Sequence, residues 1–207
     1  MKERPILFSA AMVRAILDGR KTQTRRVMKY QPSEDWRPEF YGELHKMKNG
    51  EFILRKNEPV VIGWGPCNEE GDAGYNCPYG QPGTKLWVRE SLIWVEEAGH
   101  PAWAYSADWA IVRGGSAITS QQYKIPSIHM PRIASRITLE ITGVRVERLQ
   151  DITANEALAE GTPDLRTIEN GWDMKRCFQE LWQSINGADS WASNPWVWVI
   201  EFKKVCK

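Results

Sequence analysis

A long alternation of apolar and polar residues between positions 136 and 149 constrains the fold of this chain more than any other feature. Ile137, Leu139 and Ile141 occupy every second position, and polar residues lie between them. This period of two is typical of a strand with one buried face. Gly143 then marks a bulge or turn, after which the same period resumes. The segment therefore predicts a long strand.

Three further segments predict strands: residues 6–8, 86–95 and 196–202. The segment 86–95 is apolar on both of its alternations, which indicates burial on both faces for part of its length. Arg89 and Glu90 interrupt it, and a charge inside a buried strand must be paired or hydrogen-bonded. Two interpretations follow: the two residues belong to an internal ion pair, or one of them lines a substrate-binding pocket.

Three segments predict helices. Residues 10–18 follow a suitable N-cap, Ser9, and precede Gly19, which can end the helix. Residues 154–160 follow Thr153, which with Glu156 forms a capping-box pattern. Residues 172–185 place four apolar side chains on one helical face. Those four are Phe178, Leu181, Trp182 and Ile185.

This mixture of strands and helices lacks a regular βαβ order, so it indicates an α+β fold with a mostly antiparallel sheet. The pattern does not separate an open sheet from a small closed barrel. The 207 residues suit a single domain spanning 1–207. Two stretches, 30–83 and 99–130, are expected to be insertions with long loops. Within the first, residues 51–54 and 60–62 predict a hairpin, and residues 68–83 predict a loop.

Composition excludes some classes of function. The formal net charge of +1 argues against a strong non-specific binder of nucleic acid. No apolar run is long enough to span a membrane, and no secretory signal is evident, so a cytoplasmic location is expected. Four cysteines, at 67, 77, 177 and 206, are expected to be reduced thiols. Cys67 and Cys77 lack a nearby histidine, so we predict neither a metal nor a cofactor.

The charges are distributed unevenly along the chain. Residues 1–30 contain eight Lys or Arg and two Asp or Glu, which gives +6. Residues 151–190 contain three Lys or Arg and eight Asp or Glu, which gives −5. Either these segments face each other in the fold, or each is a solvated surface.

The segment 19–26 places four cations and two hydroxyls in eight residues. Lys21 and Thr24 are three apart, so a turn can direct both to one side, and Arg26 joins that side if the chain is extended. Such a set can hold an anionic or carbonyl-bearing ligand. A solvated basic loop is the alternative, because cations also stabilise the C-terminus of a helix.

Three pieces resemble a known family when taken in order. A helix precedes the pattern Gly19-x-Lys21-x-x-Thr24-x-Arg26, a short helix runs from Thr153 to Glu160, and a strand spans 199–203. This order resembles the ASCH domain, a PUA-like β-barrel family with the signature G-x-K-x-x-[E/T]-x-R. The longer form looks like the ASCH-domain proteins of tailed phages and prophages. The resemblance implies a mostly antiparallel barrel with two or three helices.

One bacterial branch of that family comprises N(4)-acetylcytidine amidohydrolases. The branch uses a lysine, a threonine and a glutamate, and the matching positions here are Lys21, Thr24 and Glu160. The resemblance therefore implies that these three residues are catalytic. A threonine hydroxyl becomes a nucleophile only when a base takes its proton, and a lysine can be that base if its pKa falls.

We expect Arg26, Arg89 and Glu90 to bind the substrate, a modified nucleoside or RNA. Two other functions stay open. The chain could bind RNA or a modified base without catalysis, using arginines and stacked tryptophans. It could also serve in phage assembly or interaction, with the two insertions as the contact surface.

Overall fold

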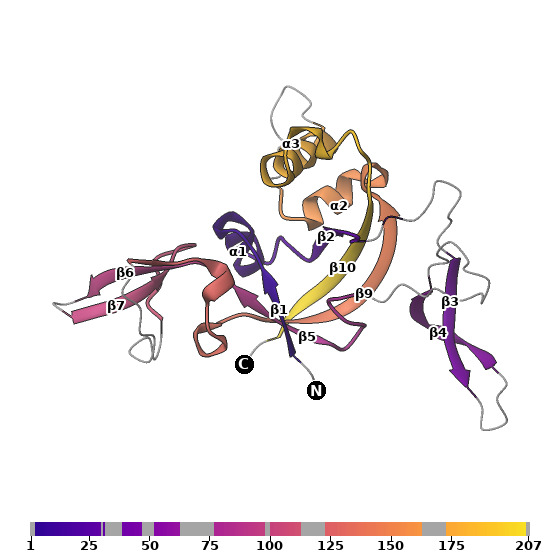
Figure 1. Cartoon of the computed structure of the whole chain (residues 1–207), viewed down its shortest axis with the longest axis horizontal. Helices are drawn as coiled ribbons and strands as arrows, with labels where there is room; N and C mark the ends of the chain where they lie inside the picture. The colour runs from indigo at the N-terminus through magenta and orange to yellow at the C-terminus, as the bar shows by residue number, and fades with distance from the viewer. Residues whose placement is uncertain are drawn as a thin grey trace.

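The computed structural model describes most of the chain, and it describes residues 39–46 and 52–62 as backbone only. The described residues are 3–29, 31, 39–46, 52–62, 77–97, 100–112, 123–162 and 173–205. A central sheet carries helices on both faces, and two smaller groups of strands project from it in opposite directions (Figure 1).

The central sheet has five strands in the order β1-β5-β9-β10-β2. These are β1 (Glu3–Leu7), β5 (Lys85–Arg89), β9 (Thr138–Arg148), β10 (Trp196–Val205) and β2 (Gln23–Val27). The pairing of β1 with β5 is parallel, and the other three pairings are antiparallel. The strand predicted from the alternation at 136–149 is thus confirmed as β9. The predicted bulge is also found, because the register between β9 and β10 shifts beside Gly143.

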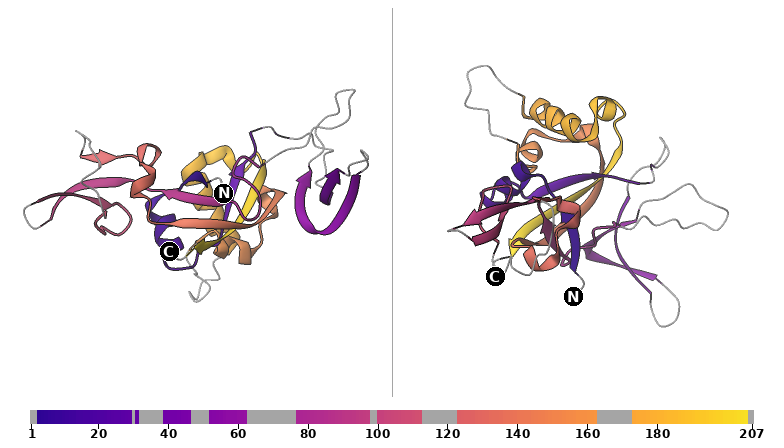
Figure 2. Two further views of the ribbon diagram at one scale, coloured as in Figure 1. Left: turned by 90° about the horizontal axis from the view of Figure 1, so that it is seen from below. Right: turned by 60° about the vertical axis from the view of Figure 1, so that its left-hand side comes forward.

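Strand β10 is buried on both faces because helices cover it from two sides. Trp198 and Ile200 belong to a core that includes Val13 and Ile16 of α1 (Ala10–Leu17). The alternate residues of β10, including Val199, pack against α2 (Ala154–Ala159) and α3 (Met174–Asn186). The helices α2 and α3 lie together beside β2 and β10 (Figures 1 and 2).

The helix boundaries follow the predicted caps. The Ser9 side chain accepts from the backbone of α1, and Gly19 ends that helix with a φ of 75°. Thr153 and Glu156 form the complete capping box of α2, a motif whose cap contributes about 1 kcal/mol. Four short 3₁₀ helices are also present in the described ranges: Ser127–His129, Arg132–Ala134, Leu149–Asp151 and Ala188–Ser190.

The single strand predicted over 86–95 is wrong. The chain leaves the central sheet after β5, turns at Glu90 and Ser91, and continues as β6 (Leu92–Glu97). Strand β6 pairs with β7 (His100–Tyr105) and β8 (Lys124–Ile125) in a separate sheet with its own small core. At this corner the Glu90 carboxylate is buried, and a cationic partner, Arg136, offsets the cost of its burial.

The hairpin predicted from 51–54 and 60–62 is also wrong in its pairing. Both segments lie in one strand, β4 (Phe52–Ile62), which pairs with β3 (Glu39–Lys46). An irregularity in the register between Gly42 and Leu44 accommodates the long partner. Cys67 and residues 68–76 of the predicted loop lie outside the described residues.

The strands of the central sheet that the structure describes do not close into a barrel, because no pairing joins the edge strands β1 and β2. A side chain bridges them instead, since the Arg26 guanidinium on β2 donates to the Leu7 carbonyl on β1 at 2.6 Å. The α+β class is confirmed. In the described part of the chain, no helix combines the length and apolarity needed to cross a membrane.

Candidate functional site

Backbone hydrogen bonds hold the basic segment between three elements. The Lys21 amide donates to the Ala15 carbonyl of α1. The Thr22 amide donates to the Ala159 carbonyl of α2, and the Thr22 carbonyl accepts from Phe202 of β10. The segment is therefore not a solvated loop, and its side chains are directed by its neighbours.

Lys21 is buried, with a side chain that is 0% exposed. Its Nζ donates to the Gln23 carbonyl at 2.8 Å, to the Glu160 carbonyl at 2.7 Å and to the Glu160 carboxylate at 2.9 Å. These three acceptors match the three N–H groups of an ammonium. The bond to Gln23 places Nζ beside the peptide that enters Thr24.

Burial lowers the pKa of Lys21 from its ordinary value of 10.5. The Glu160 carboxylate opposes this shift, while the nearby charges of Arg26 and Arg25 add to it. Lysines are almost never fully buried unless paired, and such shifts occur often at functional sites. The Lys21 amine therefore loses its proton at a lower pH here than in water.

Glu160 connects Lys21 to a second buried cation. Its second carboxylate oxygen lies 3.4 Å from the Arg25 guanidinium, so the carboxylate bridges the two. Glu160 sits at the C-cap of α2, where the helix dipole disfavours a negative charge, and the two cations offset that cost. Gly161 follows with a φ of 86°, and a Cβ there would lie 2.9 Å from the Ala15 Cβ. Only a glycine lets α1 approach the end of α2 this closely.

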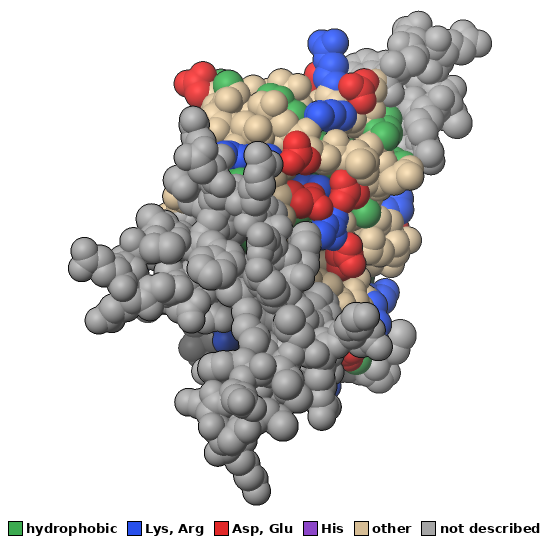
Figure 3. Space-filling view, turned by 90° about the vertical axis from the view of Figure 1, so that its right-hand side faces the viewer, with side chains coloured by type: hydrophobic (Ala, Val, Ile, Leu, Met, Phe, Trp, Pro, Cys, Tyr) green, Lys and Arg blue, Asp and Glu red, His purple; other side chains and the backbone are tan. Residues whose placement is uncertain are grey.

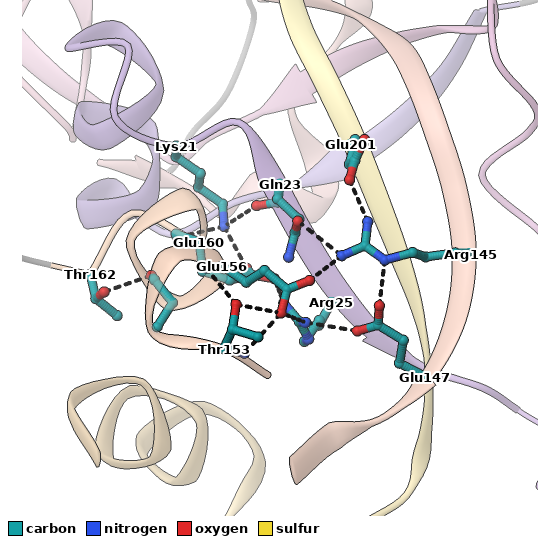
Figure 4. A network of polar contacts seen from close by, with 11 residues as sticks. Lys21, Gln23, Arg25, Arg145, Glu147, Thr153, Glu156, Glu160, Thr162 and Glu201 are labelled. Atoms are coloured by element: carbon teal, nitrogen blue, oxygen red, sulfur yellow. Dashed lines mark hydrogen bonds and ion pairs between the residues drawn. The ribbon is translucent and has the colours of Figure 1, made fainter. Parts of the chain in front are cut away.

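Arg25 is a buried residue of the candidate site that the sequence did not single out. Its guanidinium contacts Glu147 at 2.9 Å and Glu156 at 3.3 Å, in addition to Glu160. Arg145 then binds Glu147, Glu156 and Glu201, which extends the network to the surface (Figure 4). The alternation of side chains along β2 is the sequence signal that points to Arg25. It directs Arg25 to the opposite face from Thr24 and Arg26.

Thr24 and Arg26 lie on the other face of β2. Thr24 is 2% exposed and pairs with Ile200 of β10. The Arg26 guanidinium lies 5.4 Å from the centre of the Phe8 ring, and the Lys21 ammonium lies 5.5 Å from the same ring. One aromatic ring therefore lies close to two cations.

These residues border a pocket of about 170 Å³ between β2, α1 and α3. Three predicted site residues line it: Thr24, Arg26 and Glu160. Lys21 is not part of the lining, but it donates a hydrogen bond to the Glu160 carboxylate. The remaining lining is Met12, Arg25, Val27, Tyr79, Phe178, Leu181, Trp182, Ile185 and Asn186. The structure thus brings together all three predicted catalytic residues and one of the three predicted substrate-binding residues.

Arg89 and Glu90 lie away from this pocket. The Arg89 guanidinium lies 4.7 Å from the centre of the Trp87 ring. Glu90 is 1% exposed and accepts two hydrogen bonds from Arg136, each 2.9 Å long. Arg136 also binds Asp108 at the end of the projecting sheet. Of the two interpretations of Glu90, the internal ion pair matches this placement.

The basic segment 1–30 and the acidic segment 151–190 meet through ion pairs at this site. Lys21 and Arg25 belong to the basic segment, and their partners Glu156 and Glu160 belong to the acidic one. On the face shown in Figure 3, acidic and basic side chains are interleaved and not separated by sign. The described part of that face therefore lacks the uniformly basic character that attracts a polyanion.

Within the described ranges, no group of three His, Cys, Asp or Glu side chains is arranged to hold a metal ion. Cys77 is half-buried, and burial raises the pKa of its thiol.

No protein-family model matches the chain, and comparisons with curated proteins and with solved structures gave no significant match.

Proposed function

We propose that this chain is an ASCH-like protein with a PUA-like fold, and that its pocket hydrolyses the acyl amide of an N-acylated pyrimidine nucleoside such as N(4)-acetylcytidine. One observation carries the proposal: a fully buried lysine is paired at 2.9 Å with a pocket-lining glutamate, beside a pocket-lining threonine. A buried ion pair adds little to stability, so its position next to a pocket favours a chemical role.

The residues have complementary roles in this reaction. The Thr24 hydroxyl attacks the acyl carbon, and its proton passes to the neutral amine of Lys21. The C–N bond then breaks, and the leaving nitrogen takes a proton through Glu160. Water hydrolyses the acyl-threonine ester, which gives the nucleoside and the free acid and restores the hydroxyl.

Arg26 has a separate role in the same scheme. It lines the pocket on the same face of β2 as Thr24, so its guanidinium can stabilise the negative charge that develops on the acyl oxygen. The lowered pKa of Lys21 supports its part, because only the neutral amine accepts a proton.

A second function is favoured by a different observation. The Lys21 ammonium has an acceptor for each of its three N–H groups, an arrangement that also suits a permanently charged structural lysine. In that case the pocket would bind a modified nucleoside or an RNA base without reacting with it.

Incubation with N(4)-acetylcytidine, followed by chromatographic detection of cytidine and acetate, tests the proposal. Cytidine should form with the unaltered chain, and Lys21→Ala and Thr24→Ala should each abolish its formation. Turnover that persists in either variant refutes the proposed mechanism. Binding without any product supports the second function.

A further inference from the structure

The pocket lining contains three buried N–H groups that find no acceptor among the described residues. They are Nε1 of Trp182, Nε of Arg25 and Nε of Arg26. The large majority of buried side-chain polar groups in folded proteins are hydrogen-bonded, and leaving one unpaired costs about 1–3 kcal/mol. Three such donors around one pocket indicate that the pocket is built for a ligand that brings acceptors.

The carboxylate of the pocket lining is already paired with cations. Glu160 is the only carboxylate in the described lining, and Lys21 and Arg25 occupy both of its oxygens. A ligand that mainly offers N–H groups therefore meets no unpaired carboxylate in the described lining. A ligand that offers carbonyl oxygens or ring nitrogens meets unpaired donors.

The wall opposite β2 comes from α3 and is apolar except for Asn186 at its end. Phe178, Leu181, Trp182 and Ile185 repeat every three or four residues on one face of this helix. Phe178 and Trp182 are buried, but Ile185 is 52% exposed, so this face serves both the core and the pocket. An apolar, aromatic wall beside a polar edge suits a flat ring.

We infer that the pocket takes a planar heterocycle through acceptor atoms, and that Trp182 determines this specificity by donating its indole N–H to a ring or acyl oxygen while its ring packs against the heterocycle. An N-acylated cytosine fits this class, because its acyl oxygen, ring nitrogen N3 and 2-carbonyl are all acceptors. The inference rests on the proposed function for the choice of probe. It adds how the same pocket recognises its substrate.

Isothermal titration of N(4)-acetylcytidine into the full chain tests this inference. A Thr24→Ala background keeps the probe intact if the chain hydrolyses it. In that background, Trp182→Phe removes the N–H and keeps a ring, and the Kd should rise about tenfold. Trp182→Leu removes the ring as well, and the Kd should rise further.

Trp196→Phe is the matched control. Trp196 is a similarly buried tryptophan of β10, 7% exposed against 5% for Trp182, and it lies outside the pocket lining. Its substitution should change the Kd less than twofold. An equal Kd for Trp182→Phe and its background overturns the inference, and so does an absence of any binding.

A second readout needs no substitution at Trp182, so it holds even if that variant fails to fold. In ¹⁵N-labelled Thr24→Ala chain, the indole N–H signal of Trp182 should move downfield when the probe is added, and an unmoved signal overturns the inference. Failure of the proposed function is distinguishable: binding that depends on Trp182 without cytidine formation in the unaltered chain refutes hydrolysis alone. Turnover with an unchanged Kd in Trp182→Phe refutes only the assignment of Trp182.

Discussion

Two buried clusters of charge lie in different parts of this molecule, and they are built differently. Around Glu90, one arginine reaches the carboxylate through two short hydrogen bonds and reaches Asp108 through two more. The Arg136 guanidinium also lies 3.8 Å from the centre of the Tyr105 ring. This cluster joins the central sheet to the projecting sheet, and Glu90 and Arg136 are absent from the pocket lining.

The cluster around Glu160 is less complete and opens onto a pocket. A buried lysine and a buried arginine share one carboxylate, and the arginine keeps an Nε without an acceptor in the described part of the chain. Both clusters bury a glutamate, so burial of a charge alone does not distinguish them. Unsatisfied donors next to an accessible cavity are the feature that separates the two clusters.

The same substitution, glutamate to glutamine, tests the contrast at both sites, and the largest effect is expected at Glu160. Glu160→Gln removes the charge that pairs with Lys21 and, in the proposed mechanism, the group that returns a proton to the leaving nitrogen. Turnover of N(4)-acetylcytidine should fall about 10²–10⁴-fold. Steady-state assays that follow cytidine by chromatography measure this loss, and unchanged turnover would remove Glu160 from the mechanism.

Glu90→Gln should act on stability and not on chemistry. The loss of a buried, doubly bonded carboxylate should lower the free energy of unfolding by about 2–3 kcal/mol. Denaturant titration measures this change, and turnover per folded molecule should match that of the unaltered chain. A stable variant with reduced turnover would instead assign Glu90 to the substrate site.

Gly161→Ala tests whether close packing of α1 and α2 positions the Lys21–Glu160 pair. The new methyl group meets Ala15 at 2.9 Å and Lys21 at 3.0 Å in a backbone with positive φ. We expect a loss of about 2 kcal/mol in unfolding free energy, together with reduced turnover. Gly19→Ala is the control, because Gly19 also has a positive φ but has no atom within 4 Å of its added Cβ. Its cost should be about 1 kcal/mol, with turnover retained.

The smallest effect, on the pH dependence of stability, should have opposite signs in the two clusters. Burial lowers the pKa of Lys21 below 10.5, so the unfolded chain binds more protons between that lowered value and 10.5. The stability of the unaltered chain relative to Lys21→Met should therefore rise with pH across this window.

Burial raises the pKa of Glu90 above 4.5, against the opposing effect of Arg136, so the folded chain binds more protons between 4.5 and the raised value. The stability of the unaltered chain relative to Glu90→Gln should fall as pH rises through that window. Denaturant titrations across pH measure both differences. Curves of the same sign would contradict this assignment of the shifts.

Much of the fold could be predicted from the sequence because it depends on local patterns. The alternation around Gly143 predicts β9 and its bulge, and the capping box at Thr153 predicts the start of α2. The break at Glu90 could not be predicted in this way, because the segment 86–95 is apolar enough for one continuous strand. The partner of the buried Glu90 at this corner, Arg136, lies 46 residues away in the sequence.

The candidate site likewise combines features that are local in the sequence with contacts that only the tertiary structure makes. The residue types of the basic segment and the position of Glu160 in a short capped helix are properties of the sequence. The resemblance of these pieces to the ASCH domain implies the candidate catalytic set. The contact between them is not local, since Lys21 and Glu160 are 139 residues apart. Only the packing of α1 against α2 and the pairing of β2 with β10 bring them within hydrogen-bonding distance. The tertiary structure also decided which arginine completes the cluster, because Arg25 gains its partners from β9 and α2, and adjacent positions in a strand face opposite sides.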